Sequence, residues 1–68
     1  MEWKKVDHFT GKEYKKAPND GSWHIIDYVC GDIMIAELFD GKREVSKDGK
    51  VVGTFRTLKA AKAFAESL

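Results

Sequence analysis

Apolar and polar residues alternate through the middle of the chain, and two-residue turn signals interrupt them at regular intervals. The dipeptides Gly31-Asp32, Asp40-Gly41 and Asp48-Gly49 are separated by runs of strand-forming residues. Asp-Gly between alternating runs is a strong hairpin signal, because such a turn needs positive φ at both central residues. The pattern predicts an antiparallel meander with strands at residues 23–30, 33–39, 42–47 and 50–55.

Two-residue loops would also fix how these strands pair. Val29 is then expected opposite Met34, and Val45 is expected opposite both Ala36 and Val52. Side chains of a strand alternate between the two faces of its sheet. One face is expected to hold Ile26, Tyr28, Cys30, Ile33, Ile35, Phe39, Val51 and Phe55. The other is expected to hold Ile25, Val29, Met34, Ala36, Leu38, Val45 and Val52.

Helical spacing begins at residue 58 and continues to the end of the chain. Thr57 is a suitable N-cap, because its hydroxyl can accept a hydrogen bond from a first-turn N–H. Lys62 and Glu66 are spaced as an i,i+4 ion pair. The apolar stripe expected to face the sheet consists of Leu58, Ala61, Ala65 and Leu68, with Phe64 beside it.

The N-terminal segment, residues 2–16, allows two interpretations. Thr10-Gly11 can divide it into two short strands, whereas the spacing of Trp3, Val6 and Phe9 also fits half a helix. Residues 17–22 read as a loop, because Pro, Asn, Asp, Gly and Ser favour turns. The sequence therefore predicts one α+β domain, residues 1–68: an antiparallel β-meander of three to five strands with one C-terminal α-helix packed on one face.

A single short helix can cover only one face of such a sheet. The other face needs the N-terminal segment, a second copy of the chain or a partner to cover it, since an exposed apolar patch marks an interaction surface. In the first case Trp3, Phe9 and Tyr14 would close the core.

The net charge is only +1, but charge is unevenly distributed along the chain. Residues 17–41 contain five acidic and no basic residues, whereas residues 42–62 contain seven basic and two acidic residues. Pairing of opposite charges across neighbouring strands explains such asymmetry, and binding of nucleic acid or of a charged protein is the alternative explanation.

Catalytic, metal and cofactor signals are weak. The one cysteine, Cys30, excludes an internal disulfide and a cysteine-based zinc site, and His8 and His24 have no metal-ligand spacing. No phosphate-binding loop is present. The sequence predicts a protein that is not an enzyme and that has no metal or cofactor. The lone cysteine, with no visible signal peptide or long apolar run, predicts a cytoplasmic protein without membrane contact.

Nucleic-acid binding is one of the two functions that remain. A basic stripe on the third and fourth predicted strands and the helix start would contact phosphates. Its residues are Lys42, Arg43, Lys47, Lys50, Arg56 and Lys59. The acidic strands before it argue against this function.

Residues 48–64 carry a resemblance relevant to this choice. A strand ending in Phe55-Arg56-Thr57 is followed by a helix with an x-x-Ala-x-x-Phe pattern. This stretch resembles the last strand and helix of the arm-binding domains of tyrosine recombinases and of the plant AP2 domain, and also many small phage-encoded proteins. The first two families imply a sheet that reads DNA. Residues 33–39 depart from that pattern, because they lack the Arg and Lys of a DNA-reading sheet.

Protein binding is the function that the sequence favours slightly. It predicts a small accessory or inhibitor protein of phage or mobile-element type that acts on a larger host machine. The expected apolar anchors are Trp3, Trp23 and Tyr28, since aromatic residues dominate binding hot spots. A homodimer remains open, because the second sheet face can be self-complementary.

Overall fold

The computed structural model describes residues 2–16, 24–38 and 40–68. Within them, six strands form one antiparallel sheet with the order β2-β1-β3-β4-β5-β6, followed by one helix. The elements are β1 (Lys4–Asp7), β2 (Glu13–Tyr14), β3 (Ile26–Cys30), β4 (Ile33–Glu37), β5 (Arg43–Lys47), β6 (Lys50–Phe55) and α1 (Leu58–Glu66). The α+β prediction is confirmed. The predicted strand number was too low, because the N-terminal segment forms a hairpin of two short strands.

Two of the three predicted turns join strands directly. Cys30 lies opposite Ile33 across Gly31-Asp32, and Lys47 lies opposite Lys50 across Asp48-Gly49. Asp48 and Gly49 have φ values of 52° and 80°, so both central residues have the positive φ of a type I′ turn.

The prediction of a two-residue turn at Asp40-Gly41 was wrong. The first strand pair beyond this turn is Glu37 with Arg43, and the Leu38 N–H donates to the Lys42 carbonyl at 2.8 Å. The Asp40 carboxylate accepts the Lys42 N–H at 3.0 Å, an Asx-type contact that competes with the tighter turn. The β4–β5 connection is therefore longer than predicted.

This longer connection changes the pairing of β4 with β5. Val29 lies opposite Met34, as predicted, but Ala36 lies opposite Glu44 and Ile35 opposite Val45. A shift of one residue moves a side chain to the other face, so Val45 joins Ile35 instead of Ala36.

An irregularity in β6 changes a second predicted pairing. Ser46 pairs with Val51 and Val45 with Gly53, which leaves Val52 as the extra residue of a β-bulge. The predicted pairing of Val45 with Val52 was therefore wrong. Val51, predicted on the same face as Phe55, instead lies on the face of Ser46.

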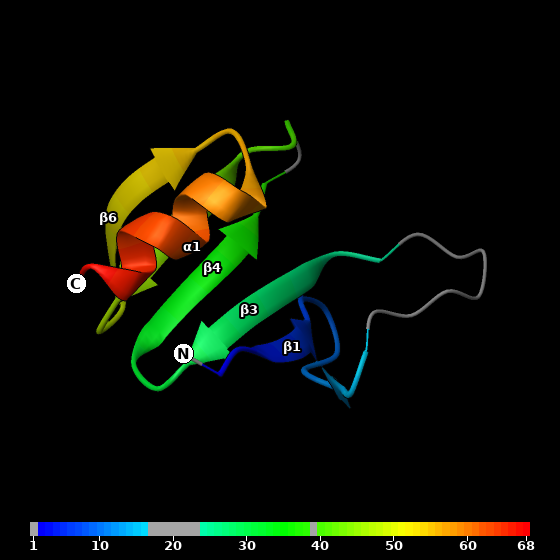
Figure 1. Ribbon diagram of the computed structural model, residues 1–68. Coiled ribbons are helices and arrows are strands. Elements are labelled where there is room, and N and C mark those ends of the chain that lie inside the picture. The colour runs from blue at the N-terminus through cyan, green and yellow to red at the C-terminus, as the bar shows by residue number, and fades with distance from the viewer. Residues whose placement is uncertain (1, 17–23, 39) are drawn as a thin grey trace.

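The hydrophobic core lies between α1 and the β4–β6 part of the sheet (Figure 1). Its fully or nearly fully buried members are Ile33, Ile35, Val45, Ala61 and Ala65. The two alanines allow close approach of helix and sheet, and partly buried Trp3, Tyr28, Phe55, Leu58 and Phe64 surround them.

The predicted helix start is confirmed, because the Thr57 hydroxyl accepts the Ala60 N–H at 3.1 Å. Leu68 does not belong to the buried stripe. The helix ends at Glu66, and 48% of Leu68 is exposed. The Lys62 ammonium lies 4.7 Å from the centre of the Tyr28 ring, and the described residues include no ion pair between Lys62 and Glu66.

The helix covers only part of the sheet. It packs on β4, β5 and β6, whereas β1, β2 and β3 continue beyond it (Figure 1). Among the described residues, no helix has the length and apolar character needed to span a membrane.

Candidate functional site

The sheet face opposite α1 carries a row of side chains that crosses four neighbouring strands. Val29, Met34, Ser46 and Val51 pair in succession from β3 to β6, so they point to the same face. We call these four residues the open row. Among the described elements only α1 packs on the sheet, and it does so on the other face.

The open row is apolar and partly accessible. Met34 is 37% exposed, Val51 is 55% exposed and Val29 is half-buried, while Ser46 is buried between them. Val52, at the bulge beside Val51, is a further exposed apolar residue. The neighbouring cross-strand row contains the carboxylates Asp27 and Glu44. Asp27 is buried and Glu44 is half-buried, while the exposed Lys4 of β1 lies opposite Val29, so charges of both signs lie beside the apolar strip.

The predicted aromatic anchors occupy different surroundings. Trp3 and Tyr28 are half-buried and pack against the core on the helix side, so the fold uses part of their apolar surface. The indole Nε1 of Trp3 is buried without a hydrogen-bond partner among the described residues. Trp23 lies outside the described residues, as does Phe39. The sequence prediction named neither Met34 nor Val51 as a binding residue.

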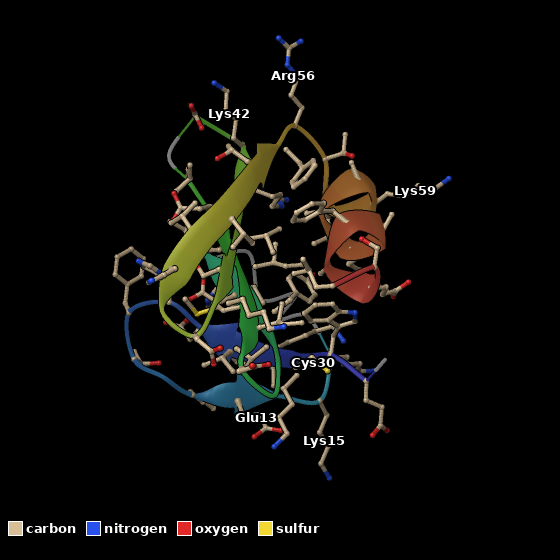
Figure 2. The ribbon with its side chains drawn as sticks, turned by 90° about the vertical axis from the view of Figure 1, so that its left-hand side faces the viewer. Glu13, Lys15, Cys30, Lys42, Arg56 and Lys59 are labelled. Atoms are coloured by element: carbon tan, nitrogen blue, oxygen red, sulfur yellow. The ribbon has the colours of Figure 1, made fainter. Side chains whose placement is uncertain are left out.

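The predicted basic stripe is divided between the two ends of the β5–β6 hairpin. Lys47 and Lys50 lie opposite each other beside the turn, while Arg43 pairs with Phe55 at the other end. Figure 2 shows Lys42 and Arg56 projecting from that second end, with Lys59 projecting from α1. Strand residues advance about 3.3 Å each, so about 13 Å of β5 separates Arg43 from Lys47.

Two of these basic side chains already have acidic partners. The Arg43 guanidinium lies 2.9 Å from the Glu37 carboxylate, and Arg43 is half-buried. The Lys42 ammonium lies 3.7 Å from Asp40. Arg56 and Lys59 are exposed. The Arg43–Glu37 pair joins β5 to β4, and the Lys42–Asp40 pair lies within the connection between them, so neither basic group is left for a continuous phosphate-binding stripe.

A buried polar cluster that the sequence prediction missed connects β1 with its neighbours. Asp7 and Asp27 are both buried, and His24 and His8 lie 3.7 Å and 3.1 Å from their respective carboxylates. One feature of the sequence could have predicted this cluster. Asp7 lies shortly before Thr10-Gly11, and this pattern is typical of a turn that an Asp side chain stabilises.

Hydrogen bonds explain how the Asp7 carboxylate is held. It accepts the N–H groups of Phe9 and Thr10 at 2.9 Å each and the Tyr14 hydroxyl at 3.2 Å. The Thr10 N–H makes the largest contribution to lowering the pKa of Asp7 from its ordinary value of 3.8; burial opposes this change, and Phe9 and Tyr14 support it. The cluster stabilises the N-terminal hairpin.

A hollow lies near this cluster, at the end of the molecule that holds Trp3 and Tyr14. Among the described residues, no group of three or more His, Cys, Asp and Glu side chains is arranged to hold a metal ion. The hollow of about 690 Å³ beside Trp3 and Tyr14 includes Cys30 in its lining but no histidine, and charges of both signs surround it. Figure 2 shows Cys30 and Lys15 at this end of the molecule.

Comparisons of the chain with protein-family models, with curated proteins and with solved structures found no match. The resemblance of residues 48–64 to recombinase and AP2 domains and to phage proteins stays a prediction.

Proposed function

We propose that this chain is a non-enzymatic protein-binding module whose contact surface is the open row. The observation that carries the proposal is the partial exposure of Met34 and Val51 on the sheet face opposite α1. Removing such side chains from water on binding is favourable, at roughly 25 cal/mol per Å² of apolar surface. A protein partner with an apolar strip supplies the matching surface.

The apolar side chains of the open row favour protein over nucleic acid as the partner of this face, because they offer no group that binds a phosphate. Glu44, half-buried in the adjacent cross-strand row, would repel phosphates, whereas the exposed Lys4 of β1 lies opposite Val29 at the other end of the open row. These two side chains of opposite charge complement charged groups at the rim of a protein surface. An accessory or inhibitory effect on the partner is part of this proposal.

Site-specific photocrosslinking tests the proposed surface. A photoreactive residue at position 34 should yield a discrete crosslinked adduct in an extract of the source cells. Excess unlabelled wild-type protein should abolish this adduct. The matched control carries the same residue at position 63, since Ala63 is exposed on the helix. Excess Met34→Glu protein should compete at least about tenfold less well than the wild type, because a carboxylate in the contact would have to lose its water.

Three outcomes would contradict the proposal. The first is an adduct at position 34 that excess wild-type protein does not abolish. The second is an adduct at position 63 as abundant as the one at position 34. The third is competition by the Met34→Glu variant as strong as that by the wild type, when the circular-dichroism spectrum of the variant is unchanged. An adduct of twice the mass of the chain would identify a second copy as the occupant. The inhibitory part is tested separately, by measuring the activity of the captured partner with and without this protein.

A further inference from the structure

The two edges of the sheet differ in length. β2 forms one edge with two residues, whereas β6 forms the other with six. In the part of the chain that the structure describes, β6 forms a ladder with β5 alone, and no turn or loop backbone hydrogen bond involves Lys50–Phe55. Figure 2, turned so that the left-hand side of Figure 1 faces the viewer, shows no helix or strand in front of β6. The β6 edge is open to a further strand.

The geometry of the hairpin indicates which backbone groups face outward. In a two-residue type I′ turn the flanking pair, here Lys47 and Lys50, exchanges hydrogen bonds. Along β5, residues that exchange backbone hydrogen bonds with β6 then alternate with residues that do not. Ser46 and Glu44 are at the positions that exchange no such bonds with β6. Their partners Val51 and Thr54 therefore direct their N–H and C=O groups away from β5.

The charges along this edge have one sign. Lys50 begins β6, Arg56 follows its last residue, and no acidic residue lies between them. Lys47 adds a third basic group beside Lys50 on the helix side of the sheet. An incoming strand with carboxylates at both ends would meet opposite charge at each end.

A second copy of the chain does not fit this edge. Two β6 strands related by a two-fold axis would pair antiparallel, and Lys50 of each copy would lie near Arg56 of the other. Like charges across such a pair are destabilising.

We propose that the β6 edge binds an extended acidic-ended segment of the partner protein as a seventh strand. The proposal rests on the function proposed above and adds how the partner binds. Side chains of the incoming strand alternate between faces. An apolar residue next to Val51 would extend the open row, and a carboxylate on the helix side would lie near Lys50. Main-chain hydrogen bonds supply affinity, and alternate side chains supply selectivity.

Fluorescence anisotropy with a designed peptide tests this proposal. The probe is a labelled peptide of alternating valine and threonine with two glutamates at each end. We expect saturable binding to the wild-type protein, and binding weaker by at least about tenfold for Lys50→Glu/Arg56→Glu. The matched control, Lys15→Glu/Lys16→Glu, makes the same change in net charge at two exposed residues away from β6. It should bind like the wild type.

Two further probes separate strand addition from simple charge attraction. A peptide with lysines in place of the glutamates should prefer Lys50→Glu/Arg56→Glu over the wild type. A peptide N-methylated at alternate residues should lose binding, because methylation removes the N–H donors of one edge. Hydrogen exchange of the Val51 and Thr54 amides should slow when the unmodified peptide is added.

The proposal is wrong if the unmodified peptide fails to bind, if N-methylation leaves binding unchanged, or if the exchange of the Val51 and Thr54 amides does not slow. A short duplex or single-stranded oligonucleotide would assign the edge to nucleic acid instead if it displaced the peptide, bound more tightly than the peptide and lost affinity steeply as salt increased. Crosslinking at position 34 without peptide binding would keep the proposed function and remove this inference. Peptide binding without that crosslink would leave the edge as a binding site in its own right.

Discussion

Gly53 shows how the absence of one side chain shapes the packing around the core. A Cβ at this position would lie 2.9 Å from the Phe55 ring and 3.3 Å from the Phe64 ring. The two rings lie 5.0 Å apart at an interplanar angle of 40°. Gly53 lies opposite Val45, so the absence of a side chain leaves space for the rings near the core.

Gly53→Ala should therefore destabilise the protein by about 1–3 kcal/mol, because the added methyl group displaces well-packed rings. Urea unfolding followed by circular dichroism measures this difference. The control is Thr54→Ala at the exposed neighbouring position, for which a change within about 0.5 kcal/mol is expected. Equal stability of Gly53→Ala and the wild type would show that the rings repack without cost.

The β4–β5 connection and the β6 bulge, more than the strands themselves, decide which face each valine occupies. Val45 is fully buried, and Val52, its predicted partner, is 43% exposed. Strict alternation would place Val51 and Phe55 together. The extra residue Val52 reverses this relation within a single strand.

A pair of isosteric substitutions tests the register. Val45→Thr buries a hydroxyl in the apolar core and should cost about 1–3 kcal/mol. Val52→Thr places the same hydroxyl in water and should change the free energy of unfolding by less than about 0.5 kcal/mol. Similar losses for the two variants would support the pairing predicted from sequence instead.

On the scale of the whole molecule, the two halves of the sheet are held in different ways. Apolar packing under α1 stabilises β4, β5 and β6. The β1–β2 hairpin lies beyond the helix, and its polar contacts centre on Asp7. The N-terminal half should therefore depend on pH more strongly than the helix half.

The direction of this dependence follows from the lowered pKa of Asp7. Because the folded state favours the ionised carboxylate, its contribution to stability is present above the ordinary value of 3.8 and is lost as pH falls through the lower folded-state pKa. The wild type should have a higher free energy of unfolding than Asp7→Asn, and this difference should be largest near pH 6 and small below about pH 4. Urea unfolding across this range measures it.

Glu66→Gln serves as the control for this experiment, since Glu66 is an exposed carboxylate at the end of α1. A difference between the wild type and Asp7→Asn that stays constant down to about pH 2.5 would contradict the role assigned to the Asp7 carboxylate. Amide exchange at low pH should increase first in β1 and β2.

Local signals in the sequence determined the elements. The positive φ of Asp48-Gly49, the Thr57 cap and the helical spacing after it act within a few residues, so the β5–β6 turn and the helix start were predictable. The pairing of β4 with β5 and the bulge at Val52 depend on contacts between neighbouring strands, and only the tertiary structure decided them. The open row and the open β6 edge follow from that pairing, which is why sequence reasoning selected the half-buried Trp3 and Tyr28 and missed Met34 and Val51.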